Sequence, residues 1–327
     1  MKSYRAHRLG GPQALKLEET EEPRPGPGEV LIAVEAMGLQ LADLATLAGE
    51  RPPRPKLPFT PGLEVAGRIA ARGTDVKGLK TGSSVVASVP WGGLAERVVA
   101  RAEACVAIPK SFAMADAAAL PFAFAGALMA LETRAGLREG QSLLVLGAGG
   151  GLGIAAVAIG KALGATVIAV ANGANRLAPA KELGADHVLD AGLVAVASAA
   201  RDLTGGDGVD VVYDPVGGEA SSHALPILKP GGHFLIAGFA AGRPQALDII
   251  PLYARGGTLI GANMVLEAQR DPAAAGAALA RVVKWVEEGK FAPRVAAQFD
   301  FQDIGPAFDY VAGRRGSGAV IVKVGAA

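Results

Sequence analysis

The chain has 327 residues, enough for two domains, and 50% of them are hydrophobic while 19% are charged, a balance that excludes a disordered chain. With 32 basic and 31 acidic residues, the net charge of +1 supplies no basic field and argues against nucleic-acid binding. The single cysteine, Cys105, excludes an intrachain disulfide and a cysteine-rich zinc site, and we expect it to be a buried apolar residue rather than a nucleophile.

Residues 1–110 are expected to form short strands separated by turns. Segments rich in β-branched residues lie at 29–39, 62–73, 83–89 and 93–103, and prolines punctuate the chain between them. This pattern predicts a compact, mostly antiparallel β domain.

From about residue 120 onward, buried strands alternate with helices. Continuous apolar runs predict six strands, and the first two are followed by helices at 151–164 and 175–185; the strands are at 142–147, 166–171, 187–190, 208–214, 231–239 and 257–263. Such alternation predicts a doubly wound parallel sheet in the dinucleotide-binding order 3-2-1-4-5-6.

The last part of the chain is expected to return to the first domain. An amphipathic helix at 272–290 is followed by a helical segment at 301–313 and a strand at 319–324. We therefore predict a substrate domain of residues 1–121 completed by 267–327, and a dinucleotide-binding domain of residues 122–266.

The sequence shows neither a secretory signal nor a membrane span. Residues 1–19 contain charge but no apolar core, and the longest apolar run, 143–160, is broken by glycines. We expect a cytoplasmic protein without membrane contact.

A glycine-rich turn lies between the first strand and the first helix of the predicted parallel sheet. Residues 148–153 read Ala-Gly-Gly-Gly-Leu-Gly, a G-x-G-x-x-G pattern with alanine in the first place. The alternative is a turn without a ligand, but a helix N-terminus in this setting provides N–H groups for phosphates. We predict that a dinucleotide binds through Gly150, Gly151, Leu152 and Gly153.

The end of the second strand indicates which dinucleotide binds. NAD sites carry an acid there, whereas this strand ends at Ala171-Asn172-Gly173, and the next acid, Glu182, lies too far along the helix. Arg176 suits the 2′-phosphate of NADPH; the alternative is a solvated arginine at a helix start. We therefore predict NADPH, with Asn172 and Arg176 among its binding residues.

Several longer segments point to a family. They are GGPQALKLEE (10–19), PGPGEVLIAVEAMGL (25–39), LPFTPGLEVAG (57–67), KALGATVIAV (161–170), LTGGDGVDVVYDPVGG (203–218) and LKPGGHF (228–234). On these segments and the glycine turn, the chain resembles the zinc-free quinone oxidoreductases of the medium-chain dehydrogenase/reductase superfamily, including the zeta-crystallin branch. The resemblance implies a GroES-like β domain beside a Rossmann domain, NADPH as cofactor, and a homodimer or tetramer.

The resemblance also bears on zinc. Zinc alcohol dehydrogenases have a ligand histidine where Gly62-Leu63-Glu64 places leucine, and a ligand cysteine near the position of Gln40. The four histidines show no metal-binding spacing. We therefore expect a reductase that works without metal.

Further site residues follow from the resemblance. The loops after the fourth and fifth strands should contact the cofactor through Val216 and Gly217 and through Gly238 and Phe239. A basic residue of the last segment, Arg315, should also contact it. The acceptor pocket departs more from the family, since Gln40 stands where asparagine is common.

The leading hypothesis is NADPH-dependent hydride transfer to a quinone or an α,β-unsaturated carbonyl compound, a small-molecule electron acceptor. Gln40 could hydrogen-bond the carbonyl oxygen as it gains negative charge, or it could only position cofactor or backbone. Two alternatives are an enoyl-thioester reductase and a non-catalytic NADPH-binding structural or regulatory protein. Because the sixth strand would leave an open sheet edge, we also expect a homodimer.

Overall fold

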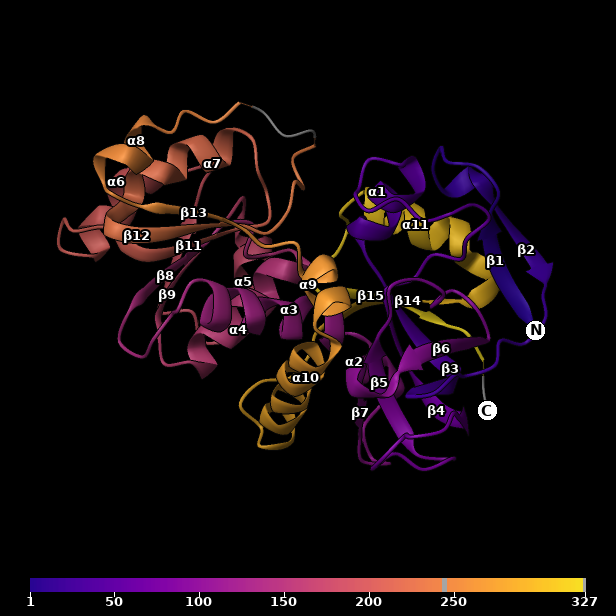
Figure 1. Ribbon diagram of the computed structural model, residues 1–327. Coiled ribbons are helices and arrows are strands. Elements are labelled where there is room, and N and C mark those ends of the chain that lie inside the picture. The colour runs from indigo at the N-terminus through magenta and orange to yellow at the C-terminus, as the bar shows by residue number, and fades with distance from the viewer. Residues whose placement is uncertain (243–245, 326–327) are drawn as a thin grey trace. The chain divides into compact units, whose positions relative to one another are not determined.

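The computed structural model describes residues 1–242 and 246–325. The chain divides into two compact units, which are shown in Figure 1. Unit 1 comprises Met1–Ala125, Val265–Glu288 and Ala292–Ala327, and unit 2 comprises Gly126–Met264 and Gly289–Phe291.

Unit 2 is built on a six-stranded parallel sheet. Its strands are β8 (Ser142–Val145), β9 (Thr166–Ala171), β10 (His187–Asp190), β11 (Val209–Asp214), β12 (Leu228–Ile236) and β13 (Thr258–Gly261). They lie in the order β10-β9-β8-β11-β12-β13, which confirms the predicted order 3-2-1-4-5-6. All six residues of β11 are buried, as in a strand covered on both faces.

Helices cover both faces of this sheet (Figure 1). The helices α4 (Gly151–Ala162) and α5 (Ala174–Glu182) lie on one face, and α6 (Val196–Leu203), α7 (Glu219–Ala224) and α8 (Ile250–Ala254) lie on the other. The short helices α3 (Gly126–Leu128), η4 (Met129–Arg134) and η5 (Leu225–Ile227) complete the unit.

Unit 1 contains a seven-stranded sheet that is antiparallel except for one pair. Its order is β14 (Val295–Asp300), β15 (Ala319–Lys323), β3 (Glu29–Leu39), β4 (Glu64–Arg72), β5 (Ser84–Ser88) and β7 (Cys105–Ala107), and β6 (Arg97–Arg101) pairs with β3. The strands β1 (Lys2–Ala6) and β2 (Leu15–Glu19) form a separate hairpin. The fold is therefore the predicted Rossmann sheet with a mostly antiparallel GroES-like domain.

Helices of unit 1 come from both ends of the chain. They are η1 (Pro12–Ala14), α1 (Leu41–Ala48), η2 (Ala102–Ala104), α2 (Met114–Ala118), η3 (Leu120–Ala125), α10 (Pro272–Glu287), η6 (Phe301–Asp303) and α11 (Ile304–Ala312), and α9 (Met264–Arg270) begins at the unit boundary. The sequence did not predict α1 or the helical stretch 114–134, in which η3 and η4 are wound as π-helix. That stretch is long and apolar enough to cross a membrane, but 72% of its most apolar window is buried, as in a core helix.

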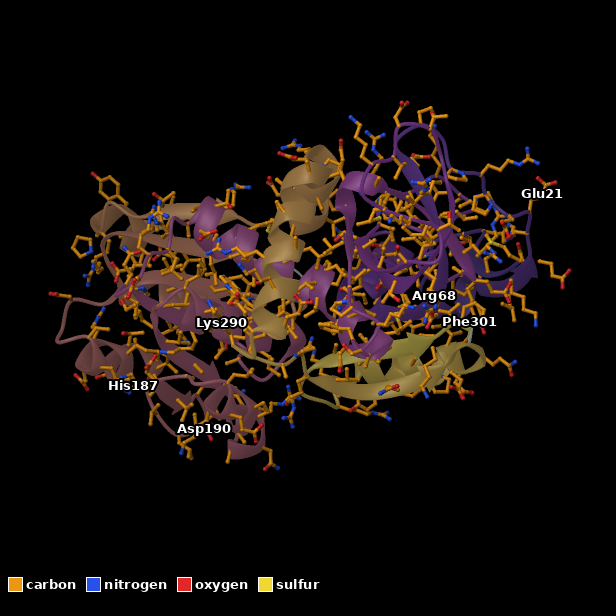
Figure 2. All side chains as sticks on the ribbon, turned by 90° about the horizontal axis from the view of Figure 1, so that it is seen from below. Glu21, Arg68, His187, Asp190, Lys290 and Phe301 are labelled. Atoms are coloured by element: carbon orange, nitrogen blue, oxygen red, sulfur yellow. The ribbon has the colours of Figure 1, made fainter. Side chains whose placement is uncertain are left out.

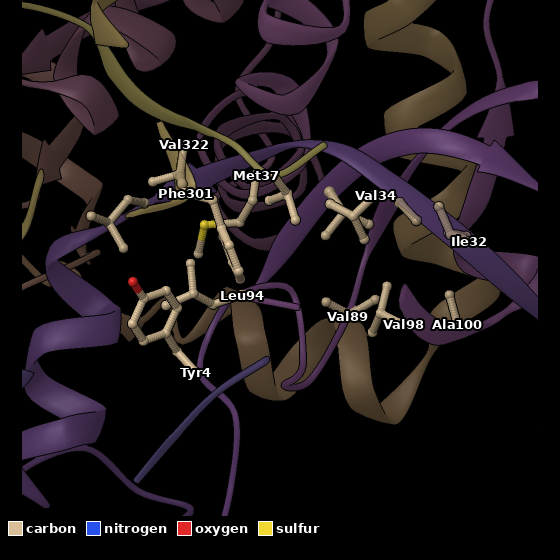
Figure 3. Packing of buried hydrophobic residues seen from close by; sticks show 14 of the residues in the cluster. Tyr4, Ile32, Val34, Met37, Val89, Leu94, Val98, Ala100, Phe301 and Val322 are labelled. Atoms are coloured by element: carbon tan, nitrogen blue, oxygen red, sulfur yellow. The ribbon is translucent and has the colours of Figure 1, made fainter. Parts of the chain in front are cut away.

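The C-terminal segment completes the core of unit 1 (Figure 3). The ring of Phe301 meets Tyr4 of β1 edge to face, with 5.0 Å between ring centroids. Strand β15 pairs antiparallel with β3, and Val322 lies opposite Met37. Residues more than 260 positions apart in the chain therefore share one hydrophobic core.

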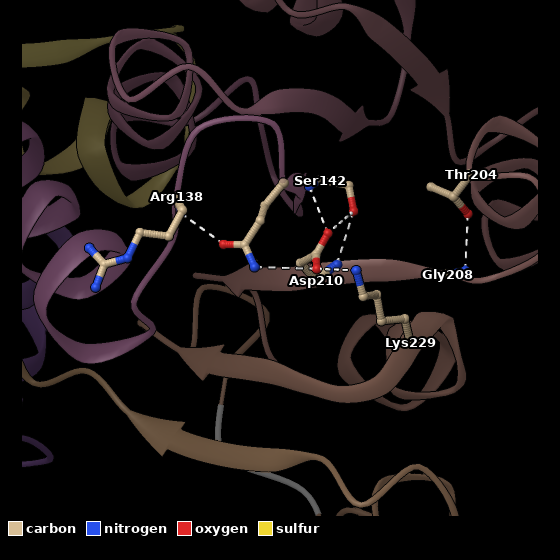
Figure 4. A network of polar contacts seen from close by, with 7 residues as sticks. Arg138, Ser142, Thr204, Gly208, Asp210 and Lys229 are labelled. Carbon is tan, nitrogen blue, oxygen red and sulfur yellow. Dashed lines mark hydrogen bonds and ion pairs between the residues drawn. The ribbon is translucent and has the colours of Figure 1, made fainter.

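A polar network joins the amino ends of β8 and β11 (Figure 4). Asp210 accepts hydrogen bonds from the backbone N–H of Ser142 at 2.9 Å and from its hydroxyl at 2.8 Å, and it forms an ion pair with Lys229. Burial alone would raise the pKa of Asp210, but Lys229 and Ser142 outweigh it and hold the pKa below its ordinary value. The network fixes the register of neighbouring strands at the edge opposite the glycine turn.

We expect Asp210→Asn to lower the free energy of unfolding by about 1–3 kcal/mol at neutral pH, because charged hydrogen bonds are lost. The folded state lowers the pKa of this carboxyl, so its contribution is present above the ordinary value and is lost as the pH falls through the folded value. The difference from wild type should therefore shrink in acid. Urea unfolding measures it, with the exposed Asp207→Asn as control; an equal deficit in acid would contradict the ion-pair account.

Candidate functional site

The carboxyl edge of the parallel sheet gathers the predicted cofactor residues of unit 2. Gly150 to Gly153 lie where β8 turns into α4, and Asn172 follows β9. Val216 and Gly217 follow β11, and the loop with Gly238 and Phe239 follows β12. Since these four strands are neighbours and parallel, their carboxyl ends meet at one edge.

The glycine turn has the shape of a phosphate cradle. A Cβ on Gly153 would lie 2.2 Å from the carbonyl oxygen of Gly147, so only glycine lets α4 approach the strand this closely. A Cβ on Gly150 would meet nothing nearer than that same oxygen, at 3.5 Å, so space is open there. The first N–H groups of α4, from Gly151, Leu152 and Gly153, have no acceptor within the helix. These features fit the pyrophosphate of a dinucleotide.

Arg176 lies close to this turn. A Cβ on Gly149 would be 2.6 Å from the carbonyl oxygen of Arg176 and 2.7 Å from its Cβ, so the turn packs on the first turn of α5. Both Arg176 and Asn172 are exposed at the surface. The predicted basic residue is therefore beside the predicted phosphate turn.

An acid also reaches this region, contrary to the expectation that none stands there. Asp190, the last residue of β10, is marked in Figure 2, and its Oδ1 accepts the N–H of Gly173 at 3.1 Å and that of Gly192 at 3.0 Å. The sequence argument considered only the strand end that carries Asn172, whereas the sheet brings the carboxylate across from the neighbouring strand. The lack of an acid is thus no longer an argument for NADPH.

The loop after β11 is shaped by Asp214, which sequence reasoning missed. This residue is fully buried, and its Oδ1 accepts the N–H groups of Val216 at 2.7 Å and Gly217 at 2.9 Å. Its Oδ2 pairs with the hydroxyl of Ser221. An acid at the last position of a strand that is expected to be buried was the available signal, since a buried carboxylate needs such donors.

The loops after β11 and β12 are joined to each other. Ala240 N–H donates to Pro215 O at 3.0 Å, and Ala241 N–H donates to Val216 O at 2.8 Å. A Cβ on Gly217 would lie 3.3 Å from the ring of Phe239, which is itself 51% exposed. The residues predicted from these two loops therefore form one surface.

A second polar cluster lies in unit 1, around Gln40. Gln40 lies between the end of β3 and the start of α1, and its Nε2 is 2.6 Å from Oε1 of Glu64, the first residue of β4. Glu64 is fully buried, and its Oε2 accepts the N–H of Phe122 at 2.8 Å. A Cβ on Gly38 would lie 2.1 Å from Glu64 Oε1, so only glycine at this position leaves room for the carboxyl group.

Asp43 is a second buried acid in this cluster. It accepts the N–H groups of Gln40 at 2.9 Å and Gly62 at 3.0 Å. Burial raises its pKa to about 6, although these N–H groups and Arg51 oppose the shift. Burial likewise raises the pKa of Glu64 to about 8, against the hydrogen bonds from Phe122 and Gln40, and the charge of Asp43 adds to the rise. The sequence indicated neither acid, because hydrogen-bonded burial is decided by tertiary packing.

Three other residues named by the sequence have clear positions. Leu63 is buried and apolar, and Cys105 is a buried thiol whose pKa burial raises to about 12, which makes it a poor nucleophile. Arg315 is exposed in unit 1 between α11 and β15, so its cofactor contact stays a prediction. Within residues 1–242 and 246–325, no three His, Cys, Asp or Glu side chains come together as metal ligands.

Comparisons with known proteins cover both units. A family model described as "Zinc-binding dehydrogenase" matches residues 151–281, and one described as "Alcohol dehydrogenase GroES-like domain" matches residues 26–110. The chain is 30% identical to a quinone oxidoreductase-like protein 2 of Bos taurus over 312 residues, which are 95% of this chain and 89% of the relative.

Two further matches bear on chemistry. The crystal structure of the quinone oxidoreductase from Thermus thermophilus, also known in complex with NADPH, has a TM-score of 0.84 at 31% identity and covers 99% of this chain and 100% of its own. A mycocerosic acid synthase-like polyketide synthase of Mycobacterium tuberculosis is 30% identical over 326 residues, which are 96% of this chain but 15% of that protein.

The buried Glu64 predicts a pH-dependent stability. Its pKa rises from 4.5 to about 8 in the folded state, so its contribution to stability is fully present below about pH 4.5 and is lost as the pH rises to about 8. We expect this group to lower the free energy of unfolding by about 1.4 kcal/mol per pH unit across that window.

Urea unfolding at several pH values measures this slope. Glu64→Gln should remove the contribution, because an amide does not ionise. Glu35→Gln, which changes another acid of unit 1, should leave it in place. A wild-type slope in Glu64→Gln would contradict the assignment.

Proposed function

Because the chain belongs to the quinone oxidoreductase family of the medium-chain dehydrogenase/reductase superfamily, we propose that it is a cytoplasmic, NADPH-dependent reductase of quinones or α,β-unsaturated carbonyl compounds that works without zinc. The observation that carries the proposal is the phosphate cradle of Gly150 to Gly153, at the edge that also holds the loops of Val216 and Phe239. The NADPH complex of the similar Thermus thermophilus enzyme supports this cofactor.

Unit 2 supplies the cofactor-binding residues. The N-terminal N–H groups of α4 bind the pyrophosphate, and the joined loops after β11 and β12 provide a surface for the rest of the dinucleotide. When bound, NADPH supplies a hydride. Arg176 favours a 2′-phosphate on the adenosine ribose, while Asp190 opposes it, so the balance of these two charges sets the preference between NADPH and NADH.

Unit 1 supplies the acceptor's hydrogen-bond donor. Gln40 offers its amide N–H to the carbonyl oxygen of the acceptor, where negative charge develops as hydride arrives. The side chain of Leu63 cannot bind a metal ion. The carbonyl oxygen of the acceptor is therefore stabilised by hydrogen bonding and not by a Lewis acid. Reduction of an electron-poor acceptor suits such a site better than oxidation of an alcohol, which needs an alkoxide to be stabilised.

An acceptor screen tests the proposal. The protein is mixed with NADPH or NADH and with quinones or short enones, and oxidation of the cofactor is followed by absorbance. Ketones that do not react with the nicotinamide cofactor serve as the negative control. Rapid oxidation with quinones or enones is expected. Tight NADPH binding with no oxidation across the panel would overturn the proposal and indicate a non-catalytic NADPH-binding protein.

Enoyl thioesters are a second candidate class of acceptor. The observation that favours them is the match over nearly the whole chain to a stretch of a polyketide synthase. The same conjugated carbonyl would accept the hydride, so Gln40 would have the same function. Comparing short enones with their coenzyme A thioesters separates the two classes, since a thioester reductase should prefer the latter.

Removing either of the two charges near the end of β9, that of Arg176 or that of Asp190, should change the preference between NADPH and NADH. We expect Arg176→Ala to raise the KM for NADPH about tenfold while leaving that for NADH nearly unchanged, because a charged hydrogen bond to phosphate is worth about 1.5–3 kcal/mol. Asp190→Asn keeps the acceptor for Gly173 N–H and should lower the KM for NADPH. Lys181→Ala, at the other end of α5, is the charge-matched control. Equal changes with both cofactors would contradict the 2′-phosphate assignment.

We also propose a homodimer formed at the β13 edge. In the part of the chain that the structure describes, β13 pairs only with β12, and an unpaired edge is normally covered. Beside it in sequence, Ile250 and Tyr253 of α8 are 69% and 86% exposed, which is unusual for such side chains.

Light scattering tests the dimer. Wild type should have twice the mass of one chain, and Ile250→Lys should shift the equilibrium toward monomer because a buried charge opposes association. Leu193→Lys, which changes another exposed apolar residue, should not. A monomeric wild type at micromolar concentration would refute the proposal.

A further inference from the structure

The Gln40–Glu64 pair can be hydrogen-bonded with either polarity. Its two atoms are 2.6 Å apart, a distance that suits a donor and an acceptor in either order. A half-turn of the glutamine amide exchanges its NH₂ group and its oxygen at nearly the same positions. An ionised Glu64 can only accept, so it draws the NH₂ group inward. A protonated Glu64 can donate its O–H to the amide oxygen, which turns the NH₂ group away.

The surroundings of Glu64 determine which of its oxygens carries the proton. Oε2 accepts the backbone N–H of Phe122 at 2.8 Å, and this donor cannot reverse. Oε1 faces Gln40 and is held against Gly38, where no Cβ could be accommodated. The proton of a neutral Glu64 therefore belongs on Oε1, directed at the glutamine amide.

The charges around Glu64 favour its neutral form. The carboxyl group is fully buried, and a buried ion needs an opposite charge to offset its lost hydration. Burial is the main reason that its pKa is about 8, and the buried Asp43 adds to the rise. Glu35 and Arg68 are paired with each other at 2.9 Å. The ionisable groups on the elements packed around Glu64 are Asp43 of α1, Arg51 after α1, Asp116 of α2, Glu29 and Glu35 of β3, and Arg68 and Arg72 of β4.

We propose that Glu64 is a positioning residue that, when protonated, fixes the Gln40 amide with its NH₂ group turned toward the acceptor's carbonyl oxygen. The inference rests on the proposed function of Gln40 as the hydrogen-bond donor to that oxygen. Loss of the Glu64 proton turns the NH₂ group back toward the carboxylate. The amide then presents its oxygen, which repels the developing negative charge on the acceptor.

The test uses Glu64→Gln, which imitates the protonated acid in shape and hydrogen bonding. The introduced amide oxygen accepts the Phe122 N–H, and the introduced NH₂ group donates to the Gln40 oxygen. For wild type we expect kcat/KM for the acceptor to fall about tenfold between about pH 7 and about pH 9, since Glu64 loses its proton near pH 8. In Glu64→Gln the ratio between these two pH values should stay near one. Glu35→Gln should keep the wild-type ratio.

A double-mutant cycle shows whether Glu64 acts through Gln40. Gln40→Leu should lower kcat/KM at least tenfold, because an oxyanion donor is removed, and its activity should no longer vary across this pH range. Adding Glu64→Gln to Gln40→Leu should change nothing more. A fall with pH that persists in Glu64→Gln, or effects of the two changes that add fully, would overturn the proposal.

A readout without turnover separates this proposal from the proposed function. The side-chain NH₂ resonances of Gln40, assigned by their loss in Gln40→Leu, should titrate near pH 8 in wild type and stay constant in Glu64→Gln. This measurement also confirms that the variant is folded. Titration with no reduction of any acceptor would mean that the proposed function fails while the switch exists, and NH₂ resonances that do not titrate in wild type would overturn the switch.

Discussion

The parallel sheet of unit 2 is the constraint from which the cofactor site follows. Strands such as β11 are buried on both faces, so their connections must be crossover helices that cover those faces. Each crossover leaves the sheet at the carboxyl end of a strand, and the order β10-β9-β8-β11-β12-β13 brings the loops of four neighbouring strands to one edge. The close approach of α4 to β8, which requires glycine at 153, then directs free N–H groups toward the same edge.

Patterns that repeat along the chain were the part that the sequence could predict. Runs of apolar residues located the six parallel strands, and the strand at 166–171 has the bounds expected for it. Strand β14, by contrast, was missed, because its six residues contain a single aromatic residue, Phe299, and its partner β15 follows some twenty positions later. The helix at 41–48 was missed as well, since its eight residues carry only a short apolar pattern. Its start is fixed by Asp43, which accepts the N–H of Gln40.

The acidic residues show where sequence reasoning fails and why. In the sequence, Asp214, Asp190 and Glu64 belong to no recognised motif. Each takes its role from hydrogen-bond partners that only the folded structure brings to it. Asp214 organises a loop through three donors, whereas Asp190 reaches Gly173 only because β10 lies next to β9. An argument from the end of one strand could not detect a carboxylate supplied by another. The charges at the proposed cofactor site therefore depend on the pairing of strands as well as on the sequence of the turn.

In the cluster around Gln40, the apolar surroundings of Glu64 determine the chemistry that we propose. Leu63, the neighbour of Glu64 in sequence, contributes no charge. The carboxyl group of Glu64 receives two hydrogen bonds, one from the side-chain amide of Gln40 and one from the backbone N–H of Phe122. Such donors offset only part of the hydration that a buried carboxylate loses, so the group keeps its proton into neutral pH. A neutral acid is also a hydrogen-bond donor, and with Oε2 committed to Phe122 its proton can be directed only at Gln40. Burial without a countercharge thus becomes a means of orienting a neutral amide toward a substrate oxygen.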